Sequence, residues 1–150
     1  MRRAEGADDY AFVQELGRAS VMSSVGDLRQ TTPALAIAAF DRLDEIVRAQ
    51  SHVGFIATQG GRRVGFVLLL DELPDEVTLM AQGFIAYMVV DPERRGTGIG
   101  TALLSAAEGE ARRLGLPYMA LMVTEENAVA RRLYERAGYQ TERRLLCKAL

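Results

Sequence analysis

A chain of 150 residues has the length of one domain, and its 49% hydrophobic and 25% charged residues are ordinary for a globular protein. The net charge of −2 argues against nucleic acid or an anionic membrane surface as the main partner, because both attract clustered Lys and Arg. The single cysteine, Cys147, excludes an internal disulfide, and no apolar run could span a bilayer, so a cytoplasmic location is expected.

The first third of the chain predicts two helices separated by a polar stretch. Asp8 or Asp9 could cap a first helix whose apolar residues lie on one face. Thr32 followed by Pro33 is the pattern of a second helix start, with apolar residues recurring at helical spacing behind it. The elements expected here are, in order, a short edge strand over 1–4, the first helix, a loop or irregular helix over 20–32, and the second helix, ending near Gln50.

The middle of the chain predicts three strands. Residues 59–62 read Gln-Gly-Gly-Arg, which predicts a hairpin turn because glycine adopts positive φ easily. The stretch after it is nearly all apolar, so that strand is expected to be buried on both faces. The expected strands span 53–58, 64–70 and 84–90, and an acid-rich loop over 71–82 separates the last two.

The remainder of the chain predicts helices alternating with strands. An apolar stripe runs from Ile99 to Leu114, and Gly115 ends that helix. Gly138 closes a second helix in the same way. The expected elements are helices over 99–114 and 127–137 and strands over 116–123 and 139–150, the last being one strand or a bent pair. No linker divides the chain, so residues 1–150 are expected to form one domain.

A glycine-rich segment from Arg95 to Gly100 joins the strand at 84–90 to the helix that follows. The first turn of a helix has unpaired N–H groups and a partial positive charge, so such a segment suits a phosphate. A Walker P-loop would need lysine after the last glycine, but Thr101 stands there. A Rossmann turn would place its first glycine directly after the strand. Two interpretations of the segment remain. It is either a binding site for the diphosphate of coenzyme A or a glycine-rich helix cap that binds no ligand.

The segment Arg95-Gly96-Thr97-Gly98-Ile99-Gly100 resembles the R/Q-x-x-G-x-G/A coenzyme A turn of the GNAT superfamily of N-acetyltransferases. Residues 87–92 resemble the strand that precedes this turn, and residues 127–139 resemble the family's N-x-x-A-x-x-L-Y-x-x-x-G-F/Y segment. The resemblance covers nearly the whole chain. It implies an α/β (α+β) fold with a mixed central sheet of six or seven strands, flanked by about four helices and splayed at its central strands.

The resemblance also implies roles for single residues. Backbone N–H groups of the turn would hold the pyrophosphate, and the pantetheine arm would pair with the strand at 88–90, where the Val89 N–H would be an oxyanion donor. Tyr134 would protonate the departing thiolate, and the alternative is a core tyrosine. Asn127 would bond the pantetheine, cap its helix, or do both. The expected cofactor-binding residues are Met88, Val89, Val90, Arg95, Gly96, Thr97, Gly98, Ile99, Gly100, Thr101, Asn127 and Tyr134, with Tyr134 and Val89 as the catalytic pair and no metal.

No general base is visible in the sequence. Many members of the family carry a glutamate on the central strand, where this chain has Phe84 and Tyr87. Members that acetylate ribosomal proteins often place a glutamate five residues before the asparagine, where this chain has Met122. His52 is expected at the surface, and Cys147 has no paired histidine, so an acyl-cysteine intermediate is not expected.

The activity implied by the resemblance is transfer of an acetyl group from acetyl-CoA to a primary amine, on a small molecule or a peptide. The amine would attack the thioester directly, through a tetrahedral intermediate. One alternative is a narrower enzyme that acts on a protein N-terminus or lysine. The other is a non-enzymatic acyl-CoA sensor, which the missing glutamate favours. Homodimers are common in the family, which makes a second copy of the chain a candidate partner.

Overall fold

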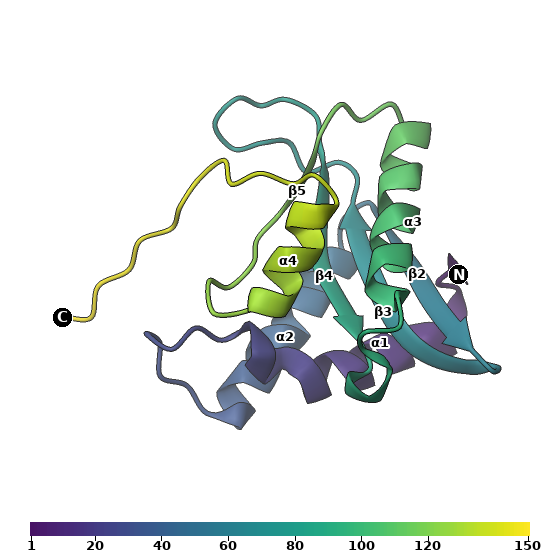
Figure 1. The fold of residues 1–150 in the computed structure, drawn as a ribbon, viewed down its shortest axis with the longest axis horizontal. Coiled ribbons are helices and arrows are strands. Elements are labelled where there is room, and N and C mark those ends of the chain that lie inside the picture. The colour runs from purple at the N-terminus through teal and green to yellow at the C-terminus, as the bar shows by residue number, and fades with distance from the viewer.

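The computed structural model describes all 150 residues. Five strands form one sheet in the order β1-β2-β3-β4-β5, and four α-helices cover its two faces (Figure 1). The elements are β1 Arg2–Arg3, α1 Gly6–Ser20, the 3-10 helix η1 Val21–Ser24, α2 Pro33–Arg48, β2 His52–Gln59, β3 Arg62–Leu70, β4 Gly83–Val90, the 3-10 helix η2 Pro92–Arg94, α3 Ile99–Arg113, β5 Met119–Leu121 and α4 Ala128–Arg136.

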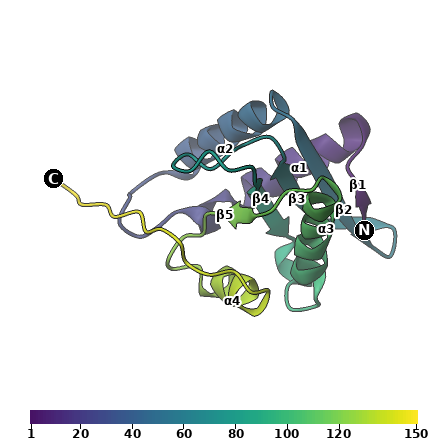
Figure 2. The same cartoon turned by 90° about the horizontal axis from the view of Figure 1, so that it is seen from above.

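The sheet separates two apolar layers. Helices α1 and α2 pack on one face, and α3 and α4 lie on the other, as the view from above shows (Figure 2). Val13 and Phe66 belong to the first layer, and Leu103 and Leu104 belong to the second. Strand β3 is buried from residue 64 to residue 70, which confirms the prediction from its continuous apolar run.

Strand directions confirm a mixed sheet. Each of the strands β1, β2 and β3 pairs antiparallel with the next strand in the chain, whereas β5 runs parallel to β4. The predicted turn at 59–62 is a hairpin in which Gly60 and Gly61 both have positive φ. None of the helices is long and apolar enough to cross a membrane.

Helix starts were predicted correctly for α2 and wrongly for α1. Thr32 Oγ1 accepts a hydrogen bond from the Leu35 N–H at 3.3 Å, with Pro33 in the first helical position. Helix α1 begins at Gly6, and Asp9 lies inside it, almost fully buried. Its carboxylate accepts from the Glu5 N–H at 2.9 Å and pairs with Arg2 and Arg63, so it joins the helix start to β1 and β3.

The sheet has five strands, not the expected six or seven. The predicted strand over 116–123 shortens to Met119–Leu121, and residues 139–150 form no strand. Beyond Tyr139 the backbone makes no hydrogen bond, and residues 141–150 are all exposed. This segment has no neighbouring strand to pair with, and a strand forms only where such a neighbour exists.

Candidate functional site

Strands β4 and β5 pair only at their first residues. The register runs from Gly83 opposite Met119 to Ile85 opposite Leu121, and pairing then stops. Met122, directly after β5, is 81% exposed, so the chain has already turned away from β4 there. The rest of β4 therefore has a neighbour only on its β3 side. This gap between the two strands confirms the expected splay of the sheet.

A β-bulge in β4 changes which residues face the gap. Leu68 pairs with Tyr87 and Leu69 pairs with Ile85, so Ala86 has no partner in β3. Ala86 and Tyr87 consequently both pack against the α1 and α2 layer, although they are consecutive in the strand. An extra residue of this kind shifts the alternation of the strand by one.

The backbone groups of Val89 point to β3 and not to the gap. The Asp91 N–H donates to the Val64 carbonyl at 2.9 Å, and a Cβ at Gly65 would lie 2.8 Å from the Val89 carbonyl oxygen. In an antiparallel ladder, alternate residues serve the same neighbour, so Val89 shares the β3 side with Asp91. The Val89 N–H therefore does not face the gap, contrary to the position expected of an oxyanion donor. An unbroken strand would have aimed it at the gap, and the bulge at Ala86 turns it away.

Met88 and Val90 take the gap-facing positions instead. The Val90 carbonyl accepts a hydrogen bond from Arg95 Nε at 3.3 Å, which confirms that it is directed away from β3. The N–H of Met88 has the same orientation by alternation, and no β5 residue stands opposite it. A bound extended group in the gap would therefore find its hydrogen-bonding partners on Met88 and Val90.

The glycine-rich segment presents a row of free amides at the end of this gap. The six consecutive N–H groups from Gly96 to Thr101 donate to no oxygen of the protein. Gly98 is the N-cap of α3 and offers no side-chain acceptor, and the first hydrogen bond of the helix runs from the Ala102 N–H to the Gly98 carbonyl. Such a row at the positive end of a 15-residue helix favours an anion.

The glycines of this segment serve two different purposes. Gly96 has φ 78° and Gly98 has φ 83°, the left-handed region that favours glycine, and no atom lies within 4 Å of where either Cβ would be. The space beside them is open to a ligand. At Gly100, by contrast, a Cβ would lie 3.2 Å from Leu133 Cδ2, so this glycine lets α4 approach α3 closely.

Helix α4 carries the two remaining predicted site residues. Asn127 Oδ1 accepts from the Ala130 N–H at 3.1 Å, so the expected helix cap is present. Tyr134 packs in the α3 layer, with its ring 5.8 Å from the ring of Tyr139. The Tyr134 hydroxyl makes no hydrogen bond within the protein, and burial raises its pKa above the ordinary value of 10.

A contact between two loops, on the other face of β4, was not found from the sequence. The Tyr87 ring lies 5.0 Å from the Phe40 ring, and its hydroxyl is 3.3 Å from Ser24 Oγ. The Ser24 carbonyl accepts from Thr124 Oγ1 at 2.7 Å, and Glu126 Oε1 accepts from the Asp27 N–H at 3.4 Å. The 20–32 loop thus joins the loop before α4, and no sequence pattern signalled this pairing.

The other candidate residues lie away from the gap. His52 opens β2 opposite Leu70, at the far end of the sheet, and is bonded to Tyr10 and the Gln50 carbonyl. Cys147 is exposed in the C-terminal segment. No group of His, Cys, Asp and Glu side chains is arranged to hold a metal ion.

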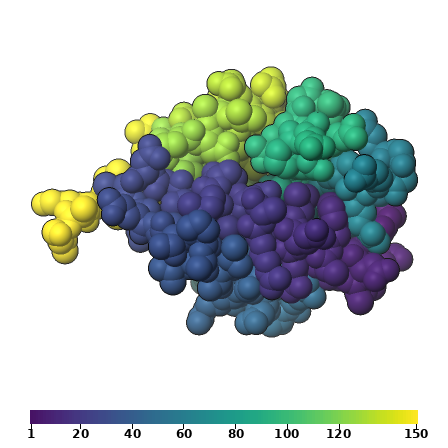
Figure 3. Space-filling model, turned by 90° about the horizontal axis from the view of Figure 1, so that it is seen from below, coloured from purple at the N-terminus to yellow at the C-terminus, as the bar shows by residue number.

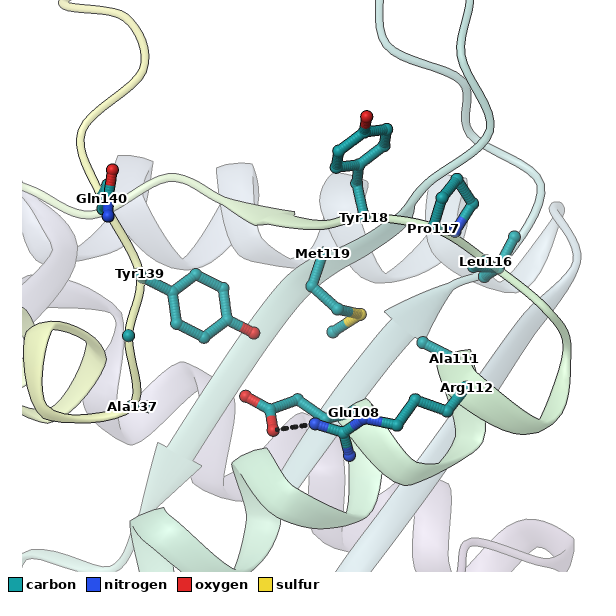
Figure 4. Close-up of a pocket in the computed structure, with 11 residues that line it drawn as sticks. Glu108, Ala111, Arg112, Leu116, Pro117, Tyr118, Met119, Ala137, Tyr139 and Gln140 are labelled. Carbon is teal, nitrogen blue, oxygen red and sulfur yellow. Dashed lines mark hydrogen bonds and ion pairs between the residues drawn. The ribbon is translucent and has the colours of Figure 1, made fainter.

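A surface pocket of about 420 Å³ lies at the opposite end of α3 from the free amides. Figure 4 shows the Tyr139 hydroxyl and Glu108 pointing toward each other across it, with Met119 at its back. Glu108 pairs with Arg112 at 3.1 Å. None of the predicted site residues lines this pocket.

Comparisons with known proteins identify the family. Residues 24–139 match the family model described as acetyltransferase (GNAT) family. A mycothiol acetyltransferase of Geodermatophilus obscurus is 35% identical over 85 residues, which cover 57% of this chain and 28% of that protein. The chain therefore spans less than a third of the length of this relative.

Solved structures share the fold. A Pyrococcus furiosus protein assigned as an acetyl transferase superposes with a TM-score of 0.83 at 24% identity, covering 99% of this chain and 98% of that one. The structure of AAC(6')-Iy with the bisubstrate analogue CoA-S-monomethyl-acetylneamine has a TM-score of 0.69 at 18% identity, covering 99% and 95%. With a family model that matches more than three quarters of its length, the chain belongs to the GNAT family of acetyltransferases.

Proposed function

We propose that this protein is an N-acetyltransferase that transfers the acetyl group of acetyl-CoA to a primary amine of a small molecule. The row of six free amides from Gly96 to Thr101 carries the proposal, together with the edge of β4 that has no β5 partner beyond Ile85. The free amides suit a diphosphate, and the open edge of β4 suits an extended chain that ends in a thioester. One ligand that carries both groups supports the proposal. That AAC(6')-Iy binds a bisubstrate analogue built on CoA, and that other relatives are mycothiol acetyltransferases, supports a small-molecule acceptor.

The diphosphate would be held by the backbone of the turn. Amides from Gly96 to Thr101 would donate to its oxygens, with the helix start adding a favourable partial charge. Arg95 contributes its backbone position here, because its side chain folds back onto the Val90 carbonyl. Arg94 is exposed beside it and adds positive charge.

The thioester end would lie along β4. Val90 and Met88 present backbone groups to the gap, and the Met88 N–H takes the role of oxyanion donor in place of Val89. One donor of this kind is worth about 3 kcal/mol where water is excluded. Asn127 uses its Oδ1 to cap α4, so it would contact the pantetheine arm through its side-chain NH2 group.

Tyr134 would donate a proton to the thiolate that leaves. Its raised pKa keeps the phenol protonated at neutral pH, and its hydroxyl is free of other partners. The amine must first lose its own proton, which costs about 4 kcal/mol for a pKa of about 10.4 at pH 7.4. Burial between Tyr87 and the joined loops would lower that cost by favouring the neutral amine.

Calorimetric titration of coenzyme A into Gly96→Ala tests the proposal. The new Cβ would stand among the free amides, so the dissociation constant should rise at least tenfold over that of the unchanged protein. Gly115→Ala is the matched control, because Gly115 has φ 73° and equally open surroundings at the other end of α3. It should lose similar stability and bind coenzyme A normally.

Two results would contradict the proposal. The first is no heat and no thermal protection when coenzyme A is added to the unchanged protein. The second is binding without thiol release from acetyl-CoA over a broad panel of small amines and peptides, which would indicate a sensor. Faster release with peptides than with small amines would place the acceptor on a protein.

A further inference from the structure

The side chain of Arg95 lies where β4 meets the glycine-rich segment. Its Nε donates a hydrogen bond of 3.3 Å to the carbonyl oxygen of Val90, the last residue of β4. Arg95 is exposed, and Figure 3 shows the green surface of this part of the chain open to solvent beside the yellow-green surface of α4. The guanidinium therefore covers the end of the strand without being enclosed by other residues.

The Val90 carbonyl is also an oxygen that a ligand in the gap would use. It is directed away from β3, and no residue of β5 stands opposite it, because the pairing of β4 with β5 ends at Ile85. An amide N–H of an extended ligand would donate to this oxygen as a neighbouring strand would. The Nε of Arg95 stands 3.3 Å from the same oxygen on the gap side, so the guanidinium and such an amide compete for one position.

No carboxylate holds Arg95 in this position. None of the ion pairs in the protein includes it, and the bond to Val90 is the only one that its side chain makes within the protein. The nearby Asp91 carboxylate accepts from the Glu93 N–H at 3.0 Å instead. A guanidinium binds a phosphate through two parallel hydrogen bonds, which is a stronger arrangement than one bond to a neutral carbonyl. The Val90 contact is therefore one that a nearby phosphate could replace.

A phosphate at the glycine-rich segment would lie next to this side chain. The six free amides begin at Gly96, the residue directly after Arg95. A Cβ at Gly96 or at Gly98 would meet no atom within 4 Å, so the surface beside them has room for both a phosphate and a guanidinium. One ligand that places an amide against Val90 and a phosphate at Gly96 would thus occupy the first position of the Arg95 side chain and offer it a second.

We propose that Arg95 makes the site selective for thioesters that carry a phosphate, an inference that rests on the proposed function. In the free protein the guanidinium covers the Val90 carbonyl and takes no part in the anion site. When acetyl-CoA binds, an amide of its pantetheine arm takes that carbonyl, and the guanidinium moves to a phosphate of the same molecule. A pantetheine thioester without phosphates must displace Arg95 and offers it no new partner, so it binds at a disadvantage.

Binding of two ligands to Arg95→Ala tests the selectivity, with NMR titration of the Met88 and Val90 amides giving each dissociation constant. S-acetylpantetheine has the amide arm and no phosphate, so it should bind the variant at least threefold more tightly than the unchanged protein. Acetyl-CoA loses a phosphate partner and should bind at least threefold more weakly. Arg42→Ala is the matched control and should change neither affinity, because Arg42 is an exposed arginine without an ion pair on α2, on the other face of the sheet.

Opposite changes for the two ligands cannot come from a general disturbance of the fold, which would weaken the binding of both. Weaker binding of both ligands to Arg95→Ala, or unchanged binding of S-acetylpantetheine, would overturn the inference. Acetyl-dephospho-coenzyme A lacks the phosphate on the ribose and identifies the partner of the guanidinium. If Arg95→Ala weakens its binding as much as that of acetyl-CoA, the partner is the diphosphate, and if not, the partner is the ribose phosphate. Either result agrees with the inference.

The NMR signal of the Arg95 Nε–H group follows the side chain directly. It is identified by its loss in Arg95→Ala, and it should shift when acetyl-CoA is added to the unchanged protein. If acetyl-CoA perturbs the Met88 and Val90 amides and this signal does not move, the inference fails while the proposed function stands. If acetyl-CoA perturbs none of these groups, the proposed function is contradicted and the inference falls with it.

Discussion

Tyr134 combines a partly buried ring with a hydroxyl that is free to donate. It lies on α4, which starts at the cap made by Asn127 and faces the start of α3 across Gly100. Burial both orients the ring and raises its pKa, so one environment explains its position and its protonation state.

Replacing Tyr134 by Phe should lower kcat at least tenfold and leave the affinity for coenzyme A nearly unchanged. The ring keeps its packing while the proton donor is lost. Because the pKa is raised, deprotonation of Tyr134 should not limit the rate of the unchanged enzyme below pH 10, which a pH profile of kcat checks. Tyr118→Phe is the control, since that ring is 54% exposed outside the gap. An unaltered rate in Tyr134→Phe would remove this residue from the mechanism.

At the scale of elements, the four helices and strands β1 to β4 followed from local pattern, whereas the bulge in β4 did not. Capping by Thr32 and the apolar run of β3 are signals carried by neighbouring residues. The bulge at Ala86 depends on how β4 pairs with β3, which no residue in β4 announces. The glycine-rich segment therefore stays a prediction as the coenzyme site, whereas the expected direction of the Val89 N–H differs from the structure, where one unpaired residue decides which amide faces the gap.

Two glycines inside helices should respond oppositely to replacement by Ala. At Gly17 in α1, the new Cβ would lie 1.9 Å from Phe40 Cζ, and Phe40 is 2% exposed with little room to move. We expect a loss of about 1–3 kcal/mol of stability. At Gly109 in α3 nothing lies within 4 Å, so Gly109→Ala should gain about 0.5–1 kcal/mol from better helix propensity. Urea unfolding measures both, and equal signs would contradict this account of α1 packing.

At the scale of the whole molecule, contacts distant in sequence hold the ends of the chain. Glu110 in α3 accepts from Arg3 Nη2 of β1 at 2.5 Å and from Arg113 at 2.6 Å. The C-terminal segment was predicted as a strand and forms none, because residues 139–150 have no neighbouring strand to pair with. Local sequence does not show whether such a neighbour exists, since that depends on the arrangement of the whole sheet.

The Glu110 contact should make stability depend on pH. Hydrogen bonds from Arg113 and Arg3 lower the pKa of Glu110 from 4.5 to about 2. The stabilisation is therefore complete above pH 4.5 and is lost as the pH falls toward 2. Glu110→Gln should cost about 1.5–3 kcal/mol at pH 7 and much less at pH 2.5, by urea unfolding. Glu135→Gln, at an exposed pair, should change stability little at either pH.

The bulge in β4 also limits how this enzyme could acquire a new acceptor. Tyr87 and Met88 are neighbours, and the extra residue Ala86 decides both the face of the sheet on which the Tyr87 ring lies and the direction of the Met88 amide, which points toward the gap. Under the proposed function, inserting or deleting a residue in β4 would therefore disturb the proposed sites of both substrates at once. Changes in acceptor preference would then be expected in the loops at 20–32 and 122–127, which can change length without shifting the Met88 amide.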